Sequence, residues 1–156
     1  MKTLILYATK NGAAAEIATR ISMKIEGAVT QNLKDDAALN FADYDCIVVG
    51  SAIYAGGFRR EAKAFLNNNA AVLKSKKLGL FASGMAKEEE QKVFADNISK
   101  DILTSARVAM LLGGIFDPAK SGLMARAIMK AVTKQSGYVN TIDDEKIAEF
   151  AKIMQG

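Results

Sequence analysis

The stretch Thr3-Leu-Ile-Leu-Tyr-Ala8, followed at once by Thr9-Lys-Asn-Gly-Ala-Ala14, carries the strongest indication of the fold of this chain. Its first half is short and apolar with no polar alternation, which is typical of a strand buried on both faces of a parallel sheet. Its second half offers a helix start, because Asn11 is a suitable N-cap and Gly12 lets the backbone approach a ligand closely. The stretch therefore predicts a strand, a glycine-containing turn and a helix in direct succession.

Three further apolar runs predict strands of the same kind, at residues 45–50, 77–82 and 107–112, and a weaker run near 27–33 predicts an edge strand. Apolar residues recur at helical spacing between and after them: Ile17, Ile21 and Ile25; Ala62, Phe65, Leu66 and Leu73; Phe94, Ile98 and Ile102; Ile147, Phe150, Ala151 and Met154. Alternating strands and helices imply right-handed crossovers and a parallel sheet between two helix layers. We predict an α/β three-layer sandwich with a five-stranded parallel sheet in the order 2-1-3-4-5.

Length and composition indicate one domain. The chain has 156 residues, of which 50% are hydrophobic and 24% charged, and its only proline is Pro118. A chain of this size builds one core. We expect a single domain over residues 1–156, with an insertion at about 116–137.

The sequence contains no histidine and one cysteine, Cys46. These counts exclude an internal disulfide and both Ser-His-Asp and Cys-His catalysis, and they disfavour a metal site made of protein ligands alone. We therefore expect the chemistry to come from a bound cofactor, without a metal. A reducing, cytoplasmic location fits the cysteine usage and the absence of a secretory or membrane-spanning run. The formal charge of +4 is spread along the chain, so no nucleic-acid partner is expected.

Three loops follow predicted strands 1, 3 and 4, where a sheet of this order binds its ligands. The candidate cofactor-binding residues are Thr9, Lys10, Asn11, Gly12, Ala13 and Ala14 in the first loop, Ser51, Ala52, Ile53, Tyr54, Ala55 and Gly56 in the second, and Ser83, Gly84 and Met85 in the third. Free amides at the helix start can hold a phosphate, with a hydroxyl from Thr9 and a charge from Lys10. Small residues in the second loop admit a flat ring, on which Tyr54 can stack.

These loops resemble those of the flavodoxin superfamily, and most closely those of the flavodoxin-type, menaquinone-dependent protoporphyrinogen dehydrogenases. The likeness lies in residues 1–12 and 16–18, continues through 49–54, and returns in 113–116 and 127–130. The resemblance implies FMN held without a covalent link, its phosphate in the first loop and its isoalloxazine ring between the second and third. It also implies an oxidoreductase that moves reducing equivalents from an organic substrate, such as a porphyrinogen, to a quinone or another acceptor.

The insertion at 116–137 goes beyond what a simple flavodoxin needs. Within it, Leu123, Met124, Ala127, Ile128 and Ala131 share an apolar arc, and Arg126, Lys130 and Lys134 flank that arc. The pattern predicts a basic amphipathic helix over 121–134. Three roles are open: packing on the domain, a lid that binds an anionic substrate over the flavin, or peripheral contact with a membrane surface or quinone.

Two other functions are compatible with the sequence. One is an electron carrier, a flavodoxin with no substrate of its own, and the other is a cofactor-free binding module, which Ala14 supports because flavodoxin phosphate loops usually carry a hydroxyl there. We expect Lys10, Arg59, Arg60 and Lys87 to favour the reduced, anionic flavin and hence electron transfer in pairs. The sequence indicates no side chain as a catalytic acid or base.

Overall fold

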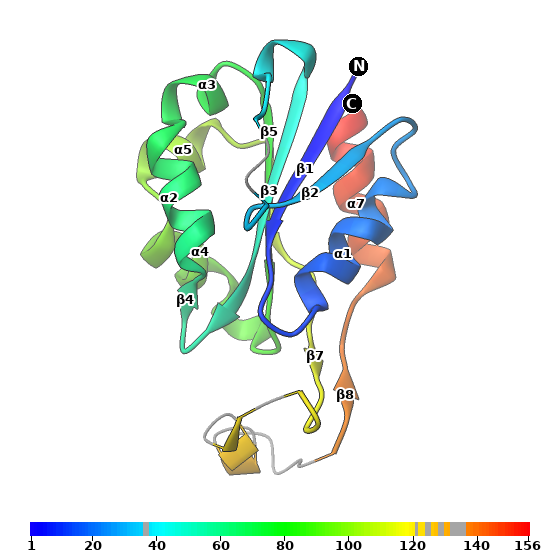
Figure 1. Ribbon diagram of the computed structural model, residues 1–156, viewed down its shortest axis with the longest axis vertical. Coiled ribbons are helices and arrows are strands. Elements are labelled where there is room, and N and C mark those ends of the chain that lie inside the picture. The colour runs from blue at the N-terminus through cyan, green and yellow to red at the C-terminus, as the bar shows by residue number, and fades with distance from the viewer. Residues whose placement is uncertain (36–37, 121, 124–125, 128–129, 132–136) are drawn as a thin grey trace.

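The computed structural model describes residues 1–35, 38–120, 122–123, 126–127, 130–131 and 137–156. A central parallel sheet lies between two layers of helices, and a narrow two-stranded arm extends from one end of the sheet (Figure 1). Within these residues, no helix is both long and apolar enough to cross a membrane.

The sheet is centred on β1 (Thr3–Ala8), which pairs in parallel with β2 (Val29–Asn32) on one side and β3 (Cys46–Tyr54) on the other. Beyond β3, the strands β5 (Lys77–Ser83) and β6 (Val108–Leu111) continue it, so the order is β2-β1-β3-β5-β6. The predicted order 2-1-3-4-5 is thus confirmed once a short hairpin strand off the main path is set aside. Because the order reverses between β1 and β3, the carboxyl ends of these strands form the switch point where such sheets bind ligands.

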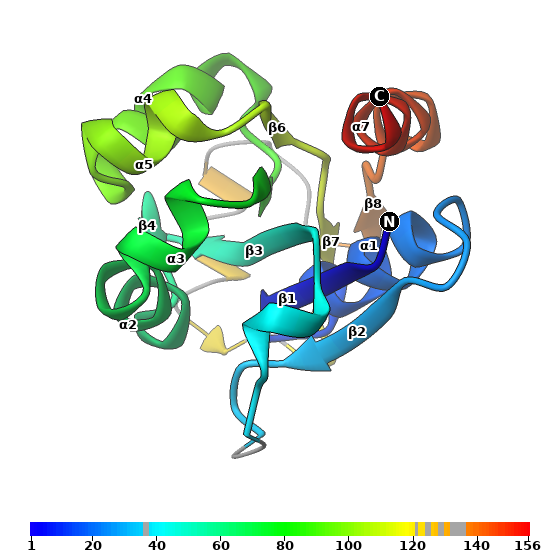
Figure 2. The same cartoon turned by 90° about the horizontal axis from the view of Figure 1, so that it is seen from above.

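One face of the sheet is covered by α1 (Ala13–Ser22) and α7 (Asp144–Gln155) (Figure 2). Side chains of alternate strand residues, among them Ile5, Val48 and Phe81, pack into the core under these two helices. The N-terminus of α1 is thereby fixed at the carboxyl end of β1.

Four shorter helices cover the opposite face: α2 (Arg60–Asn68), α3 (Ala70–Lys74), α4 (Glu90–Asn97) and α5 (Lys100–Ser105) (Figure 1). Leu4, Leu6 and Val49 pack into the core beneath them. Both faces of β1 and β3 are therefore buried, as their unbroken apolar runs predicted.

Two segments that were predicted as single helices are each divided in two. Asn69 separates α2 from α3 with a φ of −123°, and its side-chain amide donates to the Phe65 carbonyl at 2.9 Å. Ser99 starts α5, and its hydroxyl accepts from the Ile102 amide at 3.4 Å. Asn and Ser side chains compete for backbone hydrogen bonds and favour helix ends, which apolar spacing alone does not reveal.

The second predicted loop is a β-hairpin, so the third strand is longer than the predicted run 45–50. β3 continues through Tyr54 and turns at Ala55 and Gly56, both with positive φ, into β4 (Gly57–Phe58). Asn97 of α4 holds this hairpin: its Oδ1 accepts from the Phe58 amide and its Nδ2 donates to the Gly56 carbonyl, each at 2.9 Å. The hairpin fixes Tyr54 at the end of β3.

After β6 the chain forms the arm, in which β7 (Ile115–Phe116) pairs antiparallel with β8 (Val139–Asn140) (Figure 1). Thr141 secures the base of the arm, since its amide donates to the Gly114 carbonyl at 2.8 Å and its hydroxyl accepts from the Gly114 amide at 3.1 Å. The insertion was predicted, but these two strands were not.

The predicted basic helix lies between β7 and β8 in the chain. Leu123, Arg126, Ala127, Lys130 and Ala131 are helical and exposed, Leu123 to 80%. Whether this segment packs on the domain, covers the site as a lid or contacts a membrane therefore stays a prediction. Three other members of the predicted pattern, Met124, Ile128 and Lys134, lie outside the described residues.

Candidate functional site

A cavity of about 190 Å³ lies at the carboxyl ends of β1, β3 and β5. It is lined by Lys10, Asn11 and Ala13, by Ala52, Ile53 and Tyr54, by Ser83, Gly84 and Met85, and by Gly114, Ile115, Phe116 and Gly122. All three loops predicted to bind a cofactor therefore contribute to one cavity.

The first loop presents backbone amides that have no acceptor. Gly12 is the N-cap of α1 with a φ of 101°, a left-handed conformation that favours glycine, and its amide donates to the Thr9 hydroxyl at 3.0 Å. The amides of residues 13–15 precede the first hydrogen bond of the helix, from Glu16 to Gly12, and have no acceptor among the described residues. The Thr9 hydroxyl keeps its own hydrogen to donate. This arrangement suits a bound anion, because the helix dipole adds to the free amides.

Asn11 is not the N-cap, contrary to the prediction, since Gly12 holds that position without a side-chain cap. With its amide oriented to satisfy both polar atoms, Asn11 Nδ2 donates to the carbonyls of Lys10 at 3.3 Å and Lys120 at 3.2 Å. Asn11 therefore ties the first loop to the arm.

Tyr54 and Lys10 meet at the cavity. The ammonium of Lys10 lies 3.6 Å from the centroid of the Tyr54 ring, within the range of a cation–π contact. Tyr54 is 42% exposed, so its ring is open to a ligand as well as to Lys10. Among the described residues that line this cavity, Lys10 is the only charged one.

Several predicted cofactor-binding residues do not line the cavity: Thr9, Gly12, Ala14, Ser51, Ala55 and Gly56. The side chain of Ala14 is fully buried in the core, so only its backbone can serve a ligand. Ser51 is also fully buried, and its hydroxyl accepts from the Arg59 amide at 2.8 Å and donates to the Ala52 carbonyl at 2.9 Å. These hydrogen bonds give Ser51 a structural task at the hairpin.

The arm supplies one wall of the cavity, and this wall was not predicted from the sequence. Gly114, Ile115 and Phe116 line the cavity from β7 and its approach, and Gly122 lines it further along. The adjacent glycines Gly113 and Gly114, at the end of a predicted strand, were the available signal, since the other strands also ended in glycine-containing loops.

The four cations expected to surround the flavin ring, Lys10, Arg59, Arg60 and Lys87, do not line one cavity. Arg59 and Arg60 line a separate cavity with Tyr54 and Glu61, and Lys87 is exposed and lines neither. The extension of β3 into a hairpin is the reason, because it places both arginines beyond the strand end. Only Lys10 remains beside the cavity.

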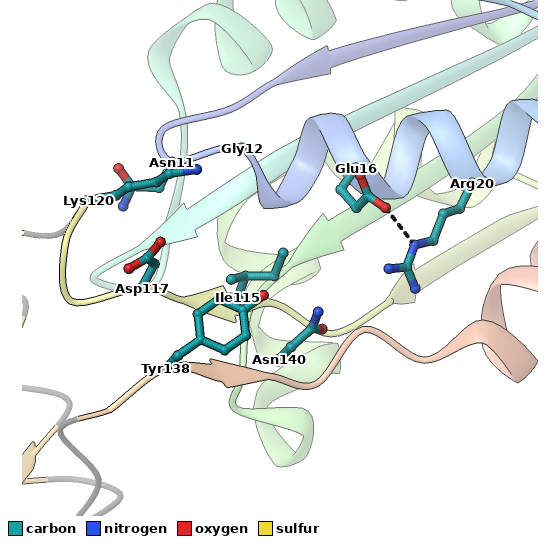
Figure 3. A pocket seen from close by; sticks show the side chains of 9 residues that line it. All are labelled: Asn11, Gly12, Glu16, Arg20, Ile115, Asp117, Lys120, Tyr138 and Asn140. Carbon is teal, nitrogen blue, oxygen red and sulfur yellow. Dashed lines mark hydrogen bonds and ion pairs between the residues drawn. The ribbon is translucent and has the colours of Figure 1, made fainter.

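A second cavity, of about 300 Å³, shares Asn11 and Ile115 with the first and lies between α1 and the arm (Figure 3). Glu16 and Arg20 of α1 face Tyr138 of the arm across it (Figure 3). Arg20 pairs with Glu16 at 2.9 Å and with Asp144 at 3.0 Å, and its hydrogen bond to Glu16 raises the pKa of Arg20. This ion pair is satisfied within the protein and does not indicate a ligand.

Chemically, the first cavity offers the acceptor-free amide of Ala13, one cation, one exposed aromatic ring and the thioether of Met85, and the acceptor-free amides of residues 14 and 15 follow directly in α1. Within the part of the chain that the structure describes, no three side chains gather as ligands for a metal ion. The arrangement suits a ligand that combines a phosphate with a flat ring.

Residues 4–143 match the family model of the flavodoxin domain. The chain belongs to the flavodoxin domain family. In this flavodoxin domain, the cavity lies at the strand ends on which the fold positions its ligands.

The chain is 24% identical, over 170 aligned positions, to the protoporphyrinogen IX dehydrogenase [quinone] of Escherichia coli K12, and the match covers 97% of this chain and 93% of that protein. Among solved structures, a flavodoxin from Streptococcus pneumoniae TIGR4 superposes with a TM-score of 0.61 at 16% identity, covering 99% of this chain and 98% of that one. A flavoprotein from Lactobacillus acidophilus in complex with FMN superposes with a TM-score of 0.54 at 15% identity, covering 72% and 91%. These structural likenesses support the fold, and the fold prediction is confirmed.

Proposed function

We propose that this flavodoxin domain binds FMN without a covalent link and works as an oxidoreductase. The observation that carries the proposal is the single cavity in which three strand-end loops meet beside the acceptor-free amides of α1. A relative of this fold is recorded with FMN bound, which agrees with the chemistry of the cavity.

The residues present fit FMN. The amides of residues 13–15, the Thr9 hydroxyl and the Lys10 ammonium would hold the phosphate. The isoalloxazine ring would lie between Tyr54, on the hairpin, and the third loop, where the soft thioether of Met85 can contact a ring edge. Ala14 would contribute through its amide, while roles for Ser51, Ala55 and Gly56 stay predictions.

When bound, FMN supplies reversible electron transfer to and from organic substrates. The chain supplies binding, orientation and electrostatics. Lys10 favours negative charge nearby, and no other charged side chain among the described residues lines the cavity. We therefore assign no catalytic residue.

A porphyrinogen is the candidate substrate and a quinone the candidate acceptor. The support is the likeness to the dehydrogenase of E. coli, together with the exposed cations Arg126 and Lys130 on the arm that walls the cavity. A porphyrinogen with carboxylate side chains would be attracted to such an arm. Peripheral contact of residues 121–134 with an anionic membrane stays a prediction, since several of these residues lie outside the described part.

The test is an anaerobic assay of FMN-loaded protein with protoporphyrinogen IX and menadione, in which porphyrin fluorescence reports the product. We expect fluorescence to grow faster than in a control without protein, and only when quinone is present. If several quinones gave no acceleration, the proposed dehydrogenase activity would be contradicted, while the proposed binding of FMN would stand.

An electron carrier is the second candidate. The exposed hairpin tip at Ala55 and Gly56, next to Tyr54, would let a protein partner approach a bound flavin. This function predicts rapid reduction of a redox protein without porphyrinogen oxidation. A cofactor-free module predicts a colourless protein that FMN does not turn yellow.

A further inference from the structure

The contact between Lys10 and Tyr54 has a consequence for ligand choice. The ammonium lies 3.6 Å from the ring centroid, so it covers part of one face of an exposed aromatic ring. Both side chains line the cavity at the strand ends. A flat ring that stacks on this face of Tyr54 has to displace Lys10.

Lys10 belongs to the loop that carries the acceptor-free amides of residues 13–15. Among the described residues it forms no ion pair, and no acidic side chain lines the cavity. Lys10 therefore contacts the Tyr54 ring in the structure. A phosphate bound to the amides would attract Lys10 more strongly than the ring does, because the phosphate is an anion.

We propose that Lys10 is a latch that makes the site select phosphorylated flavin: it covers Tyr54 in the empty site and moves to the phosphate when FMN binds. The inference rests on the proposed binding of FMN. Riboflavin has the same ring but no phosphate, so it must break the contact with Tyr54 and receives no compensating interaction from Lys10. FMN breaks the same contact and gains an ion pair with Lys10.

If Lys10 acts in this way, its loss should change the affinities for riboflavin and for FMN in opposite directions. In Lys10→Met, a chain of similar length without charge, riboflavin should bind about two- to fivefold tighter, since a cation–π contact at an exposed site has that strength. FMN should bind about three- to tenfold weaker, because it loses a charge-assisted contact. If Lys10 only attracted the phosphate, its loss would weaken the binding of FMN and leave the binding of riboflavin unchanged.

The experiment titrates flavin-free wild type, Lys10→Met and the matched control Lys87→Met with FMN and with riboflavin, following the quenching of flavin fluorescence. Lys87 is an exposed lysine near the third loop that does not line the cavity, so its variant should match wild type for both ligands. A second measurement follows the ε-methylene protons of Lys10 in wild type by NMR. They should be shifted upfield by the Tyr54 ring without flavin and lose that shift with FMN.

The crossed result, riboflavin tighter and FMN weaker in Lys10→Met alone, supports the latch. Riboflavin binding that is unchanged or weaker in Lys10→Met, or an upfield shift that persists with FMN, overturns it while FMN binding stands. Failure of FMN to bind wild type overturns both the latch and the proposed function.

Discussion

The cavity has two kinds of wall, and they are held in different ways. The walls at the ends of β1, β3 and β5 continue strands that are buried on both faces, so packing over the whole sheet fixes them. The arm is held at its base by hydrogen bonds between Gly114 and Thr141, and at its side by the contact of Asn11 with Lys120. Substitutions should therefore cost stability in the sheet and little in the arm.

The largest effect is expected for Gly50→Ala in β3. A Cβ at Gly50 would overlap the ring of Phe81 on the neighbouring strand, and both residues are enclosed by the core. We expect the free energy of unfolding in urea to fall by about 3 kcal/mol, the cost of overpacking a dense core. Gly137→Ala in the arm, where a Cβ would meet nothing within 4 Å, should cost less than about 0.5 kcal/mol. Equal losses in the two variants would contradict the distinction between sheet and arm.

The next effect concerns Gly12, at the end of the rigid wall. Alanine has room there but is strained at a φ of 101°, so the loop should shift and misplace the amides that are proposed to receive the phosphate. We expect Gly12→Ala to bind FMN about tenfold more weakly, a loss of about 1.4 kcal/mol, with riboflavin changed less than about twofold. Fluorescence titration measures both.

Tyr138→Ala in the arm is the control for Gly12→Ala, because Tyr138 is exposed and lines the second cavity but not the first. This substitution should leave the affinities for FMN and for riboflavin unchanged. A loss of FMN affinity in this variant would show that the second cavity belongs to the cofactor site.

A smaller effect is expected where the sheet meets the arm. Glu90 Oε2 accepts from the Leu111 amide at 2.8 Å, and Lys146 Nζ lies 3.2 Å from both that carboxylate and the Leu111 carbonyl. The pair supplies the outer edge of β6 with hydrogen bonds that no further strand provides. Lys146→Met should lower the free energy of unfolding by about 1 kcal/mol, since both side chains are about one third exposed. Lys152→Met, an exposed position in the same helix, should have no effect, and an equal loss there would refute the role of the pair.

The smallest effect is expected at the other end of the sheet, far from the arm. The amide of Lys2 donates to Asp45 Oδ2 at 2.9 Å, and this hydrogen bond lowers the pKa of Asp45. Because its pKa is lower in the folded state, the Asp45 carboxylate stabilises the fold at pH values above its pKa in the unfolded chain, about 4. This stabilisation disappears as the pH falls through the pKa of Asp45 in the folded state. Asp45→Asn should therefore be slightly less stable than wild type at pH 7 and approach it below about pH 4. Urea unfolding at several pH values measures the difference, with Glu26→Gln as control, and a gap that widens in acid would contradict the sign.

The same contrast explains what could be predicted from the sequence. Buried strands carry apolar residues on both faces, so Leu4, Ile5 and Leu6 indicated a parallel sheet, and the sheet order then brought three loops together. The hairpin after β3 was missed because its continuation depends on Asn97, which lies far away in the sequence. The strands of the arm are only two residues each and depend on Thr141, so no local hydropathy pattern could predict them.

The most direct test of the account is the titration of flavin-free protein with FMN and riboflavin, followed by quenching of flavin fluorescence. We predict saturable quenching by FMN, with an affinity at least about tenfold higher than for riboflavin, because the amides at the start of α1 and Lys10 are proposed to receive the phosphate. Equal affinities would contradict the phosphate site, and no quenching by either flavin would contradict the flavin site altogether.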